Sequence, residues 1–205
     1  VEQLEAARAI LLLGTHVSDE VLVELLNSQD TQVHLSILGA LAENSEVSPE
    51  IAVQITNLLN SHNEDIRVAA IEALSVGTHS EAFQLLVHCL LDDSVSSVRE
   101  QAAITLRYFR NNASLAVLSL ALFDSDGWVR SEALNSINYQ LSMLSRRKAI
   151  PHIGHAFVHL VSLLPNRSYR RRALMGLGTF FLQGVSLIST YPDPSRLFDD
   201  MIYLG

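Results

Sequence analysis

The stretch NEDIRVAAIEAL, at residues 63–74, has four counterparts elsewhere in this 205-residue chain. They are DTQVHLSILGAL at 30–41, VSSVREQAAITL at 95–106, DGWVRSEALNSI at 126–137 and NRSYRRRALMGL at 166–177. A catalytic motif usually occurs once, whereas a packing unit recurs along the chain. The repetition therefore predicts a modular structure.

The fourth residue of each stretch, here called the anchor, is aliphatic or aromatic and begins a helical pattern. The anchors are Val33, Ile66, Val98, Val129 and Tyr169, at intervals of 33, 32, 31 and 40 residues. Four positions later stand Ile37, Ala70, Ala102, Ala133 and Ala173, and eight positions later stand Leu41, Leu74, Leu106, Ile137 and Leu177. Offsets of four and eight return to one face of a helix, so each stretch predicts a helix with a small residue where a neighbour approaches.

Each of these helices follows a turn and another apolar segment. Three positions before the anchors stand Asp30, Asn63, Val95, Asp126 and Asn166. Asp and Asn there predict N-caps, and Ser94 or Ser96 is expected to replace the cap missing at Val95. No strand-like alternation is present. A helical pair of about 30 residues cannot bury both faces alone, so the pairs must stack, which predicts an all-α solenoid of antiparallel helix pairs.

The pattern LL…(D/N)xxVRxxAAxAL resembles HEAT repeats, particularly the short type named after phycobilisome lyases. Residues 18–143 match it best, residues 166–177 add a half-unit, and LLLGTH at 11–16 weakly parallels LSVGTH at 74–79. The resemblance implies a right-handed, HEAT-like or armadillo-type superhelix. It implies less about activity, because such repeats occur in scaffolds, nucleic-acid enzymes, lyases and metal hydroxylases.

The resemblance also implies a ladder of basic residues, one directly after each anchor. These are Arg67, Arg99, Arg130 and Arg170, with His34 in the first full unit. In similar repeats this residue bonds an acidic or carbonyl group of the adjacent repeat. Candidate partners here are Asp65, Asp93, Asp124 and Asp126. We expect the row to be structural, with ligand binding as the alternative.

The repeat rhythm divides the chain into units and breaks after Ile137. We expect a single domain over 1–205, with a half-unit at 1–16, units at 17–44, 48–77, 80–110, 112–144 and 151–184, and a cap or linker at 185–205. The long interval before Tyr169 predicts an extended helix to about Leu144, then the basic turn SRRK and a new helix near Pro151. Because Val1 falls inside a helical pattern, we expect the chain to be a fragment of a longer protein or a processed product.

Charge is distributed unevenly along the sequence. Residues 1–100 hold 3 Arg or Lys and 16 Asp or Glu, a net charge of −13, whereas residues 101–205 hold 11 and 6, a net charge of +5. Arginine clusters suit phosphate or carboxylate recognition because the guanidinium binds bidentately. The acidic pI of 5.4 argues against general duplex binding, so nucleic acid is disfavoured as a partner.

Other chemistry is weakly supported. His152, His155 and His159 share a helix face and are a weak metal-site candidate, because no Cys, Asp or Glu ligand is nearby. The iron-binding His-Glu pairs of HEAT-repeat hydroxylases are absent. Cys89, the single cysteine, lies among apolar residues and predicts an inert core thiol in a reducing compartment. The uncharged run 173–192 contains many polar residues, so we expect no membrane span.

These observations favour a noncatalytic protein-interaction scaffold in the cytoplasm, without a cofactor, which binds a partner with an acidic or phosphorylated surface. The alternative is an enzyme or enzyme subunit, either bilin-lyase-like or acting on nucleic acid. Trp128 is expected to be either a packing residue or a ligand anchor. The candidate partner-binding residues lie on a basic edge and on the inner, concave face of the second helices: Arg146, Arg147, Lys148, Arg167, Arg171, Arg172, Glu72, Glu100, Gln101, Arg107, Glu132 and Asn135.

Overall fold

The computed structural model describes residues 17–43, 47–75, 82–109 and 112–143, together with residues 156, 158, 161, 165, 167, 170–175 and 178. The insertion turn at 144–150, the three candidate histidines and the tail from residue 179 lie outside the described residues. Within the described ranges the secondary structure is helical, with no strand. The predicted all-α solenoid fold is confirmed.

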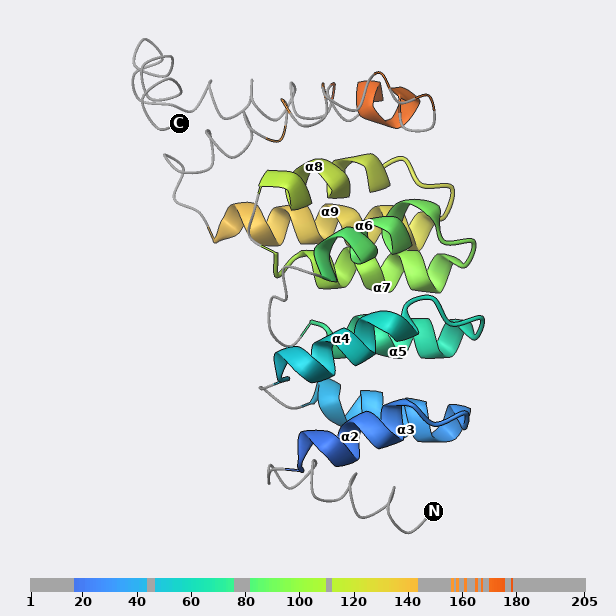
Figure 1. The fold of residues 1–205 in the computed structure, drawn as a ribbon. Coiled ribbons are helices and arrows are strands. Elements are labelled where there is room, and N and C mark those ends of the chain that lie inside the picture. The colour runs from blue at the N-terminus through green and yellow to red at the C-terminus, as the bar shows by residue number, and fades with distance from the viewer. Residues whose placement is uncertain are drawn as a thin grey trace. The chain divides into compact units, whose positions relative to one another are not determined.

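The chain divides into two compact units, Val1–Tyr108 and Phe109–Gly205. In the described part of unit 1, α2 (Asp19–Leu26) pairs with α3 (Thr31–Ala42), α4 (Pro49–Leu58) with α5 (Glu64–Ala73), and α6 (Ala82–Asp92) with α7 (Ser96–Leu106), as Figure 1 shows. Unit 2 contains the pair α8 (Asn112–Ala121) and α9 (Gly127–Ser142) and a short helical stretch at 170–175. These bounds fall inside the units expected at 17–44, 48–77, 80–110 and 112–144.

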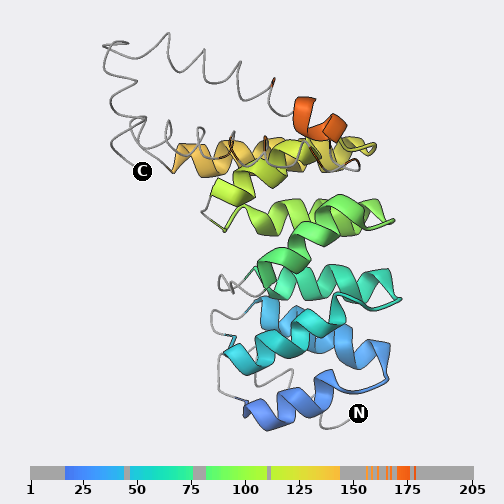
Figure 2. The same cartoon turned by 45° about the horizontal axis from the view of Figure 1, so that its top comes forward.

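The described pairs of unit 1 stack in two layers, one of first helices and one of second helices, and both Figures 1 and 2 show this arrangement. The first helices α2, α4 and α6 pack in succession, and so do the second helices α3, α5 and α7. The interface between second helices is formed at the small positions that the sequence predicted. Ala70 and Ala102 are fully buried, and Ala133 is fully buried on α9.

Side-chain caps begin most of the second helices. Asp30, Asn63 and Asp126 each accept backbone N–H groups of the first turn, with bonds of 2.8–3.4 Å. The cap expected from Ser94 or Ser96 does not form, because Val95 occupies the N-cap position and makes no side-chain cap. The register of α7 therefore matches the other helices although its cap is missing.

Helix α9 is the longest of the described helices, and a buried polar cluster fixes its far end. It runs for 16 residues and its C-cap is Met143, so the extension predicted from the 40-residue interval is present. Gln140 is buried and its Nε2 donates to the Phe109 carbonyl oxygen at 3.2 Å. The hydroxyl of Ser114, on α8, lies 3.1 Å from Gln140 Oε1 and donates to the same Phe109 carbonyl. The cluster ties α9 to α8.

Candidate interaction surface

A repeated turn precedes the second helices α3, α5, α7 and α9. The side chain five positions before the anchor accepts a hydrogen bond from the backbone N–H two residues further on, over 2.8–3.2 Å. The acceptors are Ser28, Ser61, Asp93 and Asp124. Such turns satisfy a backbone group that the solenoid would otherwise leave unpaired at its edge. Sequence reasoning missed this row, although Ser or Asp recurs at the same offset from four anchors.

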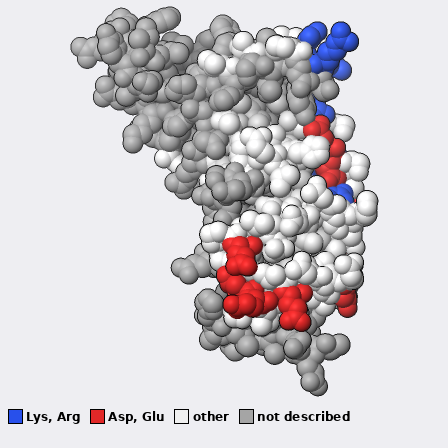
Figure 3. Space-filling model, in the orientation of Figure 1, with Lys and Arg blue, Asp and Glu red and all other residues white. Residues whose placement is uncertain are grey.

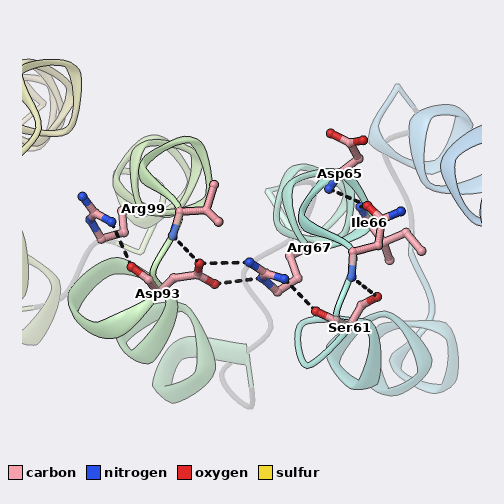
Figure 4. Close-up of polar contacts among 8 residues, drawn as sticks. Ser61, Asp65, Ile66, Arg67, Asp93 and Arg99 are labelled. Carbon is pink, nitrogen blue, oxygen red and sulfur yellow. Dashed lines mark hydrogen bonds and ion pairs between the residues drawn. The ribbon is translucent and has the colours of Figure 1, made fainter.

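The basic residue after each anchor holds the turn of its own helix pair. Arg67, Arg99 and Arg130 donate to the carbonyl oxygens of Ser61, Asp93 and Asp124 at 2.7–2.9 Å, as Figure 4 shows for the first two. His34 lies 2.9 Å from the Leu26 carbonyl through Nε2, and Arg170 donates to the Pro165 carbonyl at 3.4 Å. The sequence leads us to expect that these residues bond a carbonyl or acidic group of the adjacent repeat. The carbonyl bonds observed instead stay within one helix pair.

One member of the row also joins two pairs. The Arg67 guanidinium contacts the Asp93 carboxylate of the next pair through two hydrogen bonds, of 2.8 and 3.0 Å (Figure 4). Both side chains are only 11% exposed, so this bidentate ion pair is largely desolvated. Asp126, another expected partner, uses its carboxylate to cap α9. An acidic ladder extending along every repeat stays a prediction.

The candidate residues on the second helices are accessible to different degrees. Glu72 and Asn135, both six positions after their anchors, are exposed. Glu100, Gln101, Arg107 and Glu132 are half-buried. Asn135 donates to Glu132 at 3.1 Å across one turn of α9. These side chains supply mixed polar groups on the second helices, and their use by a partner stays a proposal.

Acidic side chains gather on part of unit 1, and exposed arginines lie on unit 2. Figure 3 shows a group of acidic side chains on the part of unit 1 that carries α2 and α4. In the first turns of these helices, Glu20 and Glu50 are exposed and Asp19 is half-buried. On unit 2, Arg167 and Arg171 are exposed, and Arg172 is half-buried. Arg146, Arg147 and Lys148 lie outside the described residues. The described part of the basic edge is therefore accessible at Arg167 and Arg171.

Trp128 is exposed on the surface rather than packed in the core. Trp128 stands directly before the anchor of α9 and is 72% exposed. The equivalent residues Gln32, Asp65 and Ser97 are also exposed, but all three are polar. Of the two roles expected for Trp128, packing in the core is excluded. An exposed tryptophan in this polar row suits a contact with a partner.

Catalytic and metal chemistry find little support in the part of the chain that the structure describes. Cys89 is buried, and burial together with the nearby Asp93 carboxylate raises the pKa of its thiol to about 11, against the opposing effect of Arg67. A thiol with so high a pKa is a poor nucleophile near neutrality. Among the described residues no group of His, Cys, Asp or Glu could hold a metal ion, and no helix is long and apolar enough to cross a membrane. His152, His155 and His159 are not among them.

The chain was compared with protein families and with solved structures. Residues 18–107 match the family model described as HEAT repeats. A crystal structure of an engineered protein, a Northeast Structural Genomics Consortium target, is similar with a TM-score of 0.51 and 22% identity, over 91% of this chain and 94% of that chain. A designed armadillo repeat protein has a TM-score of 0.48 and 18% identity, over 90% of this chain and 98% of its own.

The sequence matches no curated protein. At 22% identity the likeness to the engineered protein shows the fold alone. The closer resemblance to the phycobilisome-lyase type stays a prediction. The resemblance to HEAT repeats that the sequence predicted is confirmed over residues 18–107.

Proposed function

We propose that this protein is a noncatalytic interaction scaffold that recognises an acidic or phosphorylated protein partner. The contact surface comprises the exposed side of the second helices and the basic edge, defined as Arg146–Lys148 and Arg167–Arg172. HEAT repeats typically serve as protein-interaction scaffolds, which supports the general part of this proposal. The single cysteine, buried and with a raised thiol pKa, fits a reducing, cytoplasmic location.

The observation that carries the proposal is the contrast between committed and accessible arginines. Arg67 and Arg99 have their guanidinium groups on turn carbonyls, and Arg67 also binds the Asp93 carboxylate. Arg167 and Arg171 are exposed on a turn and helix that follow the break in the repeat. Exposed guanidinium groups offer bidentate binding to a carboxylate or a phosphate group. Residues that do not serve stacking are the ones available for recognition.

The charge asymmetry favours an acidic partner over nucleic acid. The second part of the sequence is basic, but the whole chain carries a net charge of −8. A local basic edge on an acidic protein attracts a negatively charged segment while it repels a long polyanion at the acidic unit. The association should therefore be fast at low salt and weaken as ionic strength rises.

Replacement of four arginines tests the proposal. The intact chain is first used to pull down its partner from an extract of the source organism. We expect a fourfold variant to lose this partner; its substitutions are Arg146→Ser, Arg147→Ser, Arg171→Ser and Arg172→Ser. We expect its melting temperature to stay near that of the unmodified protein, since Arg171 is exposed and the four positions lie where the sequence repeat is broken. Binding by the unmodified protein should fall with added salt.

A charge-preserving variant provides the matched control. Lysine at the same four positions keeps the net charge but lacks the planar guanidinium fork. We expect this variant to retain the salt-dependent approach and to bind with intermediate affinity. Equal partner binding by the serine variant and the unmodified protein would reject the basic edge as the recognition surface.

A further inference from the structure

The contacts of α5 show which residues of a second helix lie against the helix pair that follows. Two groups of α5 bond to that pair, the side chain of Arg67 and the backbone carbonyl of Ile71, one and five positions after the anchor. The Arg67 guanidinium binds the Asp93 carboxylate, and the Thr105 hydroxyl of α7 donates to the Ile71 carbonyl oxygen at 3.2 Å. Ile71 is 0% exposed. We call the residues one and five positions after an anchor the stacking face of that helix.

The stacking face is covered on three second helices and open on the fourth. The residue five positions after the anchor is 0% exposed on α3, α5 and α7, where it is Leu38, Ile71 and Ala103. On α9 the equivalent Leu134 is 43% exposed. An apolar residue of this size is normally covered when its helix lies inside a stack.

Among the described residues, the arginine at this position of α9 has no acidic partner, unlike its counterpart on α5. Arg130 is exposed, and its Nη1 donates to the carbonyl oxygens of Asp124 and Ser125 at 2.8 and 3.0 Å. No carboxylate among the described residues forms an ion pair with it. The sequence position that corresponds to Asp93 in the following unit is Leu164. The sequence of the following unit therefore has no acidic residue at this repeat position.

We propose that the stacking face of α9, formed by Arg130 and Leu134, binds a helix of a partner protein that takes the place of a next repeat. The partner helix carries an aspartate or glutamate opposite Arg130 and small or apolar residues opposite Leu134. The model for this contact is α5 in unit 1, where Arg67 pairs with Asp93 and the Ile71 side chain is fully buried. This inference rests on the proposed scaffold function and specifies one surface and one partner chemistry for it.

Charge complementarity selects this occupant. Arg130 has a planar guanidinium group that can bind a carboxylate, and Leu134 beside it is exposed. Together they match an amphipathic helix that begins with an acidic residue. In the sequence, the interval of 40 residues before Tyr169, against 31–33 elsewhere, also breaks the regular repeat directly after α9. A second copy of the protein is the competing occupant, and it would make the protein self-associate.

The segment that covers the equivalent face of α5 provides a probe. A synthetic peptide with the sequence of residues 93–106, DSVSSVREQAAITL, contains both Asp93 and Thr105. Titrated to about 1 mM into the intact protein, it should change the fluorescence of Trp128, the only tryptophan of the protein, which lies two residues before Arg130. The peptide with Asp93→Asn should bind about tenfold more weakly, since a partly desolvated charge pair is worth on the order of 1.4 kcal/mol.

Variants of the protein locate the binding. Leu134→Ser should abolish the fluorescence change without lowering the melting temperature, because Leu134 is exposed. Val53→Ser, at an exposed apolar position on α4, is the matched control and should bind the peptide as the unmodified protein does. No fluorescence change with the original peptide, or equal binding by Leu134→Ser, would overturn the proposal.

A cysteine in place of Leu134 tests whether the chain itself or a second copy of the protein covers the stacking face of α9. In the variant Leu134→Cys, the new thiol should react quickly with a maleimide when the protein is free and monomeric. When the protein is saturated with peptide, the same reaction with the maleimide should be slow. The buried Cys89 should stay unreactive in both cases. Slow reaction in the free monomer would mean that the chain covers its own α9, and protection through self-association would identify a second copy. Either result would overturn the proposal. If the cellular partner is still retained by Leu134→Ser, only this inference fails, whereas no specific partner at all would reject the scaffold function.

Discussion

Buried alanines set the distance between neighbouring second helices. Ala102 is fully buried on α7, which packs against α5. Replacing it with leucine adds three carbon atoms where no space exists, so we expect Ala102→Leu to lower the free energy of unfolding by roughly 1–3 kcal/mol. Chemical denaturation measures the loss. Ala69→Leu, at a half-buried position of α5, is the control and should cost much less. A neutral Ala102→Leu would show that the register assigned to α7 is wrong.

The Arg67–Asp93 pair is the described ionic link between two repeats. Because both side chains are largely buried, removal of one partner leaves a charge without compensation. We expect Arg67→Met or Asp93→Asn alone to destabilise unit 1 by about 3–5 kcal/mol, and the double variant to lose less than the sum. A double-mutant cycle from denaturant unfolding measures this coupling. Strictly additive losses would contradict a direct pair.

Cys89 makes stability depend on pH in alkaline solution. Folding raises the pKa of its thiol from an ordinary 9.0 to about 11, because burial and the Asp93 carboxylate both disfavour the thiolate. The folded state therefore holds the proton more tightly. Its contribution to stability is complete below about pH 9 and is lost as the pH rises towards about 11. Urea unfolding should show a steeper alkaline loss for the unmodified protein than for Cys89→Ala, and equal slopes would contradict this.

At the scale of single helices, the N-caps explain where the second helices begin. Asp126 accepts the Trp128 and Val129 N–H groups, whereas Val95 gives α7 no side-chain cap. We expect Asp126→Ala to cost about 1 kcal/mol and Val95→Asn to gain a similar amount, since Val95 already has the extended backbone of a cap residue. Thermal unfolding of the two variants measures both shifts. A loss of stability in Val95→Asn would show that the valine side chain contributes more by packing.

At the scale of the whole molecule, the sequence pattern predicts a helical protein. Each apolar stripe in the sequence has the period of a helix, and the described units contain helices α2–α9 without a strand. We therefore expect far-ultraviolet circular dichroism of the intact chain to show a helical spectrum that disappears on heating. Substantial β-sheet signal would contradict the solenoid fold.

The sequence by itself determined the fold, the pair boundaries and the buried alanines. These features depend on local information: an apolar period of 3.6, a capping residue before each helix and a repeat of about 32 residues. Val98 and Val129 are fully buried as their anchor positions predict. The missing cap at Val95 and the longer α9 also left a local trace in the sequence. Local patterns suffice here because each pair contacts its neighbours in the same way.

Only the tertiary structure decided which repeated positions are covered and which polar groups meet. Arg67 reaches Asp93, 26 residues away, while Arg130 on α9 is exposed. Gln140 looks like a surface residue by type, yet its amide is buried against a carbonyl 31 residues earlier. Leu38 and Leu134 occupy equivalent sequence positions, but one is covered and the other is open. Burial depends on what the neighbouring pair places against a helix, and that contact is not encoded in the helix's own sequence.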